Sequence, residues 1–211
     1  MFHTQLHTQH SLHVVPCCPP AGFRALGCVT SLTGLHVIRH GKFDEATYAG
    51  AITGLSCLTR LKELRCYAGY APWRQGTPST PDGVAQAKCW GTVLPCMPHL
   101  TRLELVEADA SDPLLCAIGS SAPQLQRLVL ERDHWSAGSS KKGAGAIAHV
   151  KHIELLFTKG FECSRNLQLV RLPGVRRVLS RWLGAWRDQP CEMQGWSQEK
   201  CPCEVCFFKR Q

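Results

Sequence analysis

Apolar residues recur along the chain in a six-residue block with the pattern Leu-x-x-Leu-x-Leu. One copy begins at Leu100, the next at Leu125 and a third at Val150, so the starts lie 25 residues apart twice. Two further copies begin at Leu32 and Leu61. Alternating apolar and polar positions over a short segment are typical of a strand with one buried face. Each block therefore predicts a short strand.

Each block is followed by an apolar stretch whose spacing is compatible with a helix. The clearest stretches run from Asp44 to Leu58 and from Asp112 to Ile118. The step between the second and third blocks is longer than the others because a segment rich in Gly and Pro, residues 69–83, intervenes. Such composition predicts a loop insertion. Strands alternating with helices predict an α/β fold in which the strands run parallel.

A leucine block that recurs at a fixed period of about 25 residues resembles the leucine-rich repeat family. The resemblance implies a solenoid over residues 28–187, with short parallel strands on the concave face and helices or irregular coils on the convex face. The family usually has Asn or Cys at the ninth position, counting the first residue of the block as one. Four blocks of this chain have other residues there, which leaves the repeat subclass open: His40, Gly69, Ala108 and Asp133.

The end of the repeat domain has two interpretations. A sixth block would begin at Val175, again 25 residues on, but Ser180 would then occupy a buried position. Alternatively, apolar residues from Val175 to Trp186 follow helical spacing after Pro173 and Gly174. We expect an amphipathic helix at 174–187 that caps the open end of the core.

Two segments outside the repeats predict poorly ordered tails. Residues 1–27 contain four histidines and two adjacent prolines, and residues 188–211 contain four cysteines spaced C-x9-C-x-C-x2-C. A metal on the histidines or a zinc ion on Cys191, Cys201, Cys203 and Cys206 is the alternative. The spacings are incomplete, so we predict no metal and no cofactor.

Thirteen cysteines without a recognisable signal peptide or membrane span predict an intracellular, cytoplasmic protein with reduced thiols. Cys57, Cys66 and Cys116 fall at apolar positions of the repeat pattern. We expect them to act as small buried hydrophobic residues.

The third and fifth residues of each block are expected to project from the concave sheet. Together with flanking positions they give a predicted partner-binding set: Arg65, Tyr67, Arg102, Glu104, Arg127, Arg132, His152 and Glu154. Charges of both signs with a few aromatic or aliphatic residues are typical of a protein-binding surface. The sequence therefore predicts a protein-protein interaction module, scaffold or adaptor without catalytic residues.

Two other functions stay open at this point. The net charge is +8, and six arginines lie between residues 165 and 187 without an acidic residue among them. This segment favours nucleic acid or an anionic surface as an alternative partner. A second alternative is an enzyme, because Arg39-His40-Gly41 after an apolar run resembles the opening motif of the histidine phosphatases, in which the histidine accepts the phosphoryl group.

Overall fold

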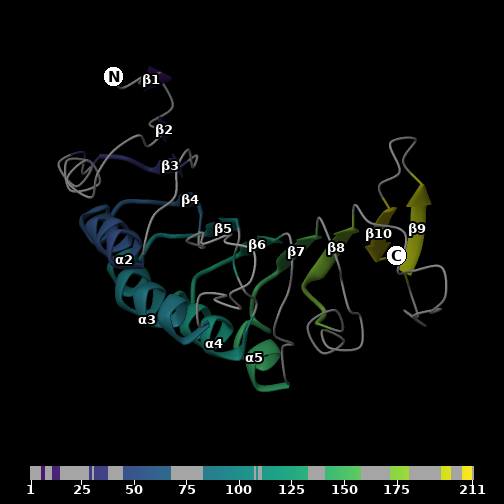
Figure 1. Cartoon of the computed structure of the whole chain (residues 1–211). Coiled ribbons are helices and arrows are strands. Elements are labelled where there is room, and N and C mark those ends of the chain that lie inside the picture. Colours follow the sequence, from purple (N-terminus) through teal and green to yellow (C-terminus); the bar gives the residue numbers. More distant parts are fainter. Residues whose placement is uncertain are drawn as a thin grey trace, which may run out of the picture.

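The computed structural model describes residues 6–7, 11–14, 29, 31–37, 45–67, 83–106, 108, 111–132, 141–157, 172–180, 196–200 and 206–210. All of its strands belong to one sheet, and its α-helices lie side by side along one face of that sheet (Figure 1). The chain is thus an α/β protein, as the alternation of strand and helix patterns predicts.

The strands are β1 (Leu6–His7), β2 (Ser11–Val14), β3 (Gly34–Val37), β4 (Glu63–Tyr67), β5 (Arg102–Val106), β6 (Arg127–Arg132), β7 (His152–Phe157), β8 (Val175–Ser180), β9 (Trp196–Lys200) and β10 (Cys206–Arg210). The helices are α2 (Glu45–Gly54), α3 (Gly83–Val93), α4 (Asp112–Ser121) and α5 (Lys141–Ala146). Short 3-10 turns at Leu55–Cys57 and Leu94–Cys96 extend α2 and α3.

Parallel pairing runs without a break from β2 to β8, and each strand lies beside its neighbour in the sequence. Leu103 pairs with Leu128, and Leu128 pairs with Ile153. These partners are 25 residues apart, which equals the spacing of the blocks. The third and later positions of these blocks are therefore paired with one another in the sheet. The five strands that the blocks predict are confirmed as β3 to β7.

The core lies between the sheet and the helices. Because side chains alternate along a strand, the leucines of the blocks all point to the same face. Leu64, Leu103 and Leu128 are buried there against helix residues such as Trp90 and Ile118. One strand and one helix bury too little apolar surface to fold alone, so stacking of successive units makes the core continuous.

The segments that lead from each helix into the next strand form a repeated turn at one edge of the sheet. We call this the amino edge, and it comprises residues 59–62, 98–101, 123–126 and 148–151, which lead into β4 to β7. In every unit the first apolar residue of the block donates its backbone N–H to a carbonyl three residues earlier, as Leu100 does to Met97 at 3.0 Å. The carbonyl oxygen of Lys62 then accepts hydrogen bonds from both Thr101 and Arg102 of the next unit. These backbone bonds hold neighbouring units in register.

Side chains add to the amino edge. The amide Nε2 of Gln124 donates to the carbonyl oxygen of Met97 at 3.0 Å. One unit further on, His149 Nε2 lies 3.4 Å from the carbonyl oxygen of Ala122. Both contacts join residues 27 positions apart and occupy the same place in the repeat. A polar side chain at this position therefore links each of these two units to the one before it.

The two helices expected at 44–58 and 112–118 are confirmed as α2 and α4. The capping helix predicted at 174–187 is wrong over its described part, because Val175–Ser180 forms β8. Val175 keeps the repeated turn, donating its N–H to Leu172 at 3.0 Å, and the strand then pairs with β7 through an irregular register at Ile153 and Glu154. The backbone N–H and C=O groups at the edge of β7 can form hydrogen bonds with another strand but not with a helix. Valine also favours strands.

Two further expectations need correction. The N-terminal tail predicted at 1–27 contributes β1 and β2, and β2 extends the parallel sheet beyond β3. The tail predicted at 188–211 contributes β9 and β10, which add to β8 as an antiparallel hairpin. The loop insertion expected at 69–83 lies outside the described residues except for its last residue, which begins α3.

The three cysteines expected to be buried behave differently from one another. Cys66 is buried, Cys116 is half-buried and Cys57 is exposed at the end of the 3-10 turn. The expectation is therefore confirmed for Cys66 and wrong for Cys57, because the 3-10 turn buries Leu55 and leaves Cys57 exposed. No helix within the described ranges has the length and apolar character required to cross a bilayer.

Candidate partner-binding face

The face of the sheet turned away from the helices carries charged side chains in register. Glu63, Arg102, Arg127 and His152 are neighbours on four successive strands, and a second row lies two residues further along each strand. We call the following set the polar sheet face: Glu63, Arg65, Arg102, Glu104, Arg127, Glu131, His152 and Glu154. Parallel strands lie about 4.8 Å apart, which brings the side chains of a row within reach of one another.

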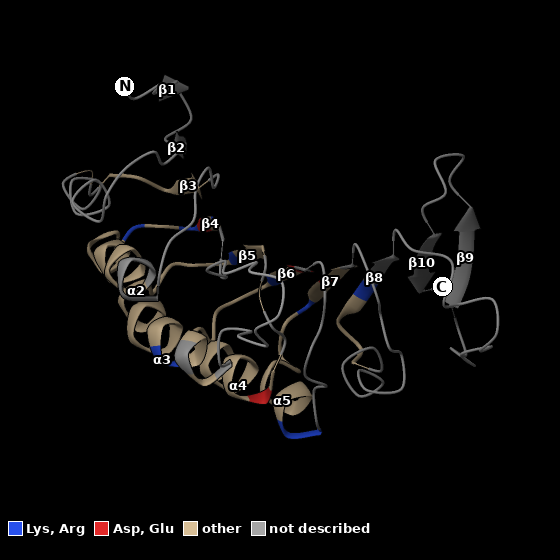
Figure 2. Cartoon of the chain, viewed as in Figure 1, with Lys and Arg blue, Asp and Glu red and all other residues tan. Residues whose placement is uncertain are grey.

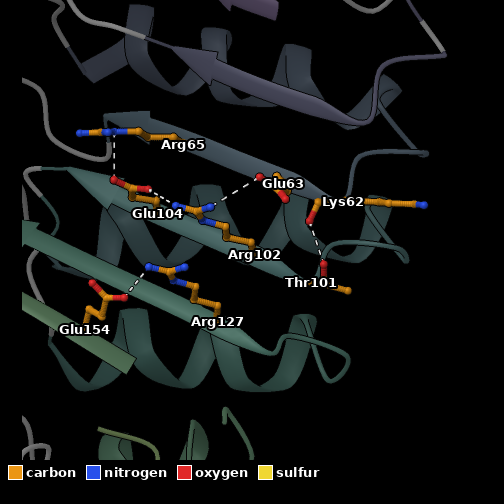
Figure 3. Close-up of polar contacts among 8 residues, drawn as sticks. All are labelled: Lys62, Glu63, Arg65, Thr101, Arg102, Glu104, Arg127 and Glu154. Atoms are coloured by element: carbon orange, nitrogen blue, oxygen red, sulfur yellow. Dashed lines mark hydrogen bonds and ion pairs between the residues drawn. The ribbon is translucent and has the colours of Figure 1, made fainter. Parts of the chain in front are cut away.

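Glu104 is the centre of this face. Its Oε1 lies 3.0 Å from Nε of Arg65, and its Oε2 lies 3.4 Å from Nη2 of Arg102 (Figure 3). Only 11% of the Glu104 side chain is exposed. A carboxylate so far removed from water needs charged partners, and here each of its oxygens has one. The two arginines are held in fixed positions by the same group.

The network extends on both sides of Glu104. Arg102 Nη1 lies 3.7 Å from Oε2 of Glu63, and Arg65 Nη2 lies 3.7 Å from Oε2 of Glu131. Glu63 and Arg65 come from β4, Arg102 and Glu104 from β5, and Glu131 from β6. A continuous line of ion pairs therefore crosses three strands.

A second ion pair joins the next two strands. Arg127 on β6 donates from Nη2 to Oε1 of Glu154 on β7 (Figure 3). Every arginine and every glutamate of the polar sheet face thus has an oppositely charged partner. With three arginines and four glutamates, the face is nearly neutral although the chain carries a net charge of +8.

Two valines are buried beneath these charges. Val106 is 6% exposed and Val129 is 3% exposed, although both share the strand alternation of the polar sheet face. The contact between Arg65 and Glu131 crosses β5 between Glu104 and Val106. The polar sheet face therefore contains buried apolar positions among its charges.

A hollow of about 260 Å³ opens beside the network, over β3, β4 and β5. Its lining consists of Gly34, Leu35, His36, Glu63, Leu64, Arg65, Arg102 and Glu104. Gly34 occupies the position on β3 that Glu63 and Arg102 occupy on the next strands. Since glycine has no side chain, the row of long charged side chains has a gap at Gly34, and Ser11 of β2 is the next residue in register.

The residues of the predicted partner-binding set lie in two different parts of the sheet. Arg65, Arg102, Glu104, Arg127, His152 and Glu154 all lie on the polar sheet face, as the strand alternation requires. Tyr67 and Arg132 lie at the carboxyl ends of β4 and β6, where only the backbone is described. Arg132 has the strand parity of the buried Leu128 and Leu130, so its place in the set is not supported by the register.

Three residues outside the predicted set belong to the site. Glu63 and Glu131 complete the line of ion pairs, and His36 lines the hollow. All three occupy positions that project from this face of the sheet by the same alternation. The position of each residue in the repeat is therefore the sequence signal that identifies it. Which of these charged residues would contact one another depends on side-chain geometry, which the repeat does not encode.

The two alternative functions depend largely on residues outside the described part of the chain. Arg39, His40 and Gly41 are among those residues. His149 precedes β7, and His152 begins it. Of the arginines between 165 and 187, the side chain of Arg176 alone is described, and it is exposed.

No group of His, Cys, Asp and Glu within the described residues is arranged to hold a metal ion. Three of the four C-terminal cysteines, Cys191, Cys201 and Cys203, lie outside those residues. The chain matches no model of a known protein family, and no curated protein matches it.

Proposed function

We propose that the chain is a leucine-rich repeat solenoid that binds another protein through the polar sheet face and performs no catalysis. The architectural part of the proposal rests on the agreement between sequence period and sheet register. Leu103, Leu128 and Ile153 are paired at the 25-residue interval of the blocks, and the same turn recurs at the amino edge.

The observation that carries the function is the ion-pair network around Glu104. Arg65 and Arg102 are fixed by this buried carboxylate, yet 41% and 37% of their side chains remain exposed. Arginines that are both held in place and accessible lose little conformational entropy when a partner binds. Arginine is also enriched among the residues that dominate protein-protein binding energy.

The hollow over β3 to β5 gives this surface a shape as well as a charge pattern. It brings the guanidinium groups of Arg65 and Arg102, the carboxylates of Glu63 and Glu104 and the imidazole of His36 around one depression. Groups of both signs around a depression favour a partner side chain that can be recognised by direction as well as by charge. A nucleic-acid groove would instead carry one sign of charge with stacking rings.

The test compares two variants with equal loss of charge. One carries Arg65→Gln and Arg102→Gln on the polar sheet face, where the glutamine amides can still donate to Glu104. The control carries Lys88→Gln and Lys141→Gln, which are exposed on α3 and α5. Both are used for affinity capture from a nuclease-treated cell extract, after thermal unfolding has shown that both are folded.

We expect a protein that the wild type and the control retain and that the sheet-face variant retains about tenfold less, a difference of about 1.4 kcal/mol in binding free energy. The interaction is then measured again with the purified partner. If the sheet-face variant and the control retain the same proteins in the same amounts, the polar sheet face is not the binding surface.

A further inference from the structure

Exposed positive charge lies at the amino edge as well as on the polar sheet face. The four segments of that edge, 59–62, 98–101, 123–126 and 148–151, contain three residues of Lys or Arg and no Asp or Glu. The three are Arg60, Lys62 and Lys151, and all are exposed. Two exposed histidines, His99 and His149, lie in the same segments.

The folding of the repeat brings these cations to one edge of the sheet. Arg60 and Lys62 precede β4, and Lys151 precedes β7. Figure 2 shows Lys and Arg on the segments leading into β4 and β7. Three strand spacings of about 4.8 Å separate the first pair from Lys151, or about 14 Å.

These cations differ from the arginines of the polar sheet face in having no acidic neighbours in their own segments. The nearest acidic residue in the sequence is Glu63, whose Oε2 lies 3.7 Å from Arg102 on the sheet face. The side chain of Lys62 extends away from that network (Figure 3). Charges of one sign along an edge produce a potential that attracts a partner of the opposite sign.

The backbone of the amino edge is well fixed. Thr33, Lys62 and Thr101 each offer one carbonyl oxygen to two N–H groups of the next unit. The cations therefore project from a rigid line of turns. Between Lys62 and Lys151 the line carries Gln124 and Gln126, whose neutral amides suit peptide groups better than an unbroken row of phosphates.

We propose that the amino edge binds an acidic segment of another protein, a stretch rich in Asp and Glu that runs along the turns from Arg60 to Lys151. Phe, Tyr and Trp are absent from the four segments. Sites for single-stranded nucleic acid combine cations with aromatic rings on which bases stack. An acidic peptide needs only the cations and the amides. This surface is separate from the polar sheet face and does not depend on its function.

The experiment uses the full-length chain and two fluorescent probes, a 20-residue poly-glutamate peptide and a 20-nucleotide oligo-dT. The edge variant carries Arg60→Glu, Lys62→Glu and Lys151→Glu. The control carries Lys88→Glu, Lys141→Glu and Lys142→Glu on the helices, so that the change in net charge is the same. Fluorescence anisotropy gives Kd for each protein and probe at low and at high salt.

The proposal expects poly-glutamate to bind the wild type and the control alike and the edge variant about tenfold or more weakly, since reversal of a surface charge removes its attraction and adds repulsion. The affinity should fall as salt is raised. Equal losses in the edge variant and the control would overturn the proposal, because net charge alone would then explain binding. Stronger binding of oligo-dT than of poly-glutamate would overturn it in favour of nucleic acid.

Discussion

Arg65 reaches across β5 to Glu131, two strands away, while its Nε is held 3.0 Å from Glu104 on the strand between them. One side chain thus joins three strands of a sheet whose backbone already holds them together. Because Arg65 remains partly exposed, the arrangement stabilises the surface without removing it from partners. This combination distinguishes the polar sheet face from a set of independently solvated charges.

The first prediction concerns the carboxylate at the centre of this network. Glu104→Ala leaves Arg65 and Arg102 without the group that both contact, and two guanidinium groups then face each other across a partly buried site. We expect the free energy of unfolding to fall by about 1–3 kcal/mol, measured by urea denaturation. Glu63→Ala is the control, since Glu63 has one ion pair and is 63% exposed. It should cost less than about 1 kcal/mol, and equal losses in the two variants would contradict a central role for Glu104.

The second prediction concerns the packing of α4 against α5. A Cβ atom on Gly119 would lie 2.2 Å from the carbonyl oxygen of Ala146, whereas a Cβ on Gly145 would meet nothing within 4 Å. Gly119→Ala should therefore force the helices apart and lower the free energy of unfolding by about 1–3 kcal/mol. Gly145→Ala should raise it by about 0.5–1 kcal/mol, because alanine favours helix over glycine. Thermal unfolding compares the two, and a stabilising Gly119→Ala would show that the helices are not in close contact.

The sequence predicts the repeated part of this fold well and its ends poorly. Each strand from β3 to β7 buries leucines at fixed positions, so period and alternation determine both the register and which residues share a face. At Val175 the same residues satisfy a helical and a strand pattern, and the choice depends on the open edge of β7, which is a tertiary feature. The ends at β1, β2, β9 and β10 have no repeat to reveal them.

The sequence likewise predicts the candidate site only in part. The alternation of the blocks is sufficient to place Arg102, Glu104 and Arg127 on one face. It does not show that Glu104 binds two arginines at once, or that a hollow opens beside Gly34. The conformation of a long side chain decides which of several neighbours it contacts. A hollow depends on the size of the side chains on the adjacent strands.

The third prediction concerns Cys66, which occupies a leucine position on β4, in register with Leu105. Burial raises the pKa of its thiol to about 12. Because the pKa is higher in the folded state than in the unfolded state, the folded protein binds more protons above pH 9, and stability must fall as pH rises from about 9 toward 12. Between pH 9 and 11 the wild type should lose more stability than Cys66→Val, which removes the titrating group. Equal losses would show that Cys66 does not contribute.

The same burial predicts a difference in reactivity between cysteines. The exposed Cys57 should react quickly with a thiol reagent such as iodoacetamide under native conditions, and the buried Cys66 should react only after unfolding, since the thiolate is the reactive form. Mass spectrometry of peptides from the labelled protein locates each modification. Rapid labelling of Cys66 in the folded protein would contradict its place in the core.

The last prediction tests the side-chain contacts between successive turns of the amino edge. Gln124 donates from Nε2 to the carbonyl oxygen of Met97 in the preceding unit at 3.0 Å, whereas Gln126, two residues later, is exposed. Gln124→Ala should lower the free energy of unfolding by about 1 kcal/mol, the usual net value of one hydrogen bond, and Gln126→Ala should change it by less than about 0.5 kcal/mol. Urea denaturation of the two variants decides the matter, and hydrogen exchange should show faster opening of the turn at residues 98–101 in Gln124→Ala. If both variants match the wild type, the backbone ladder alone holds the units together.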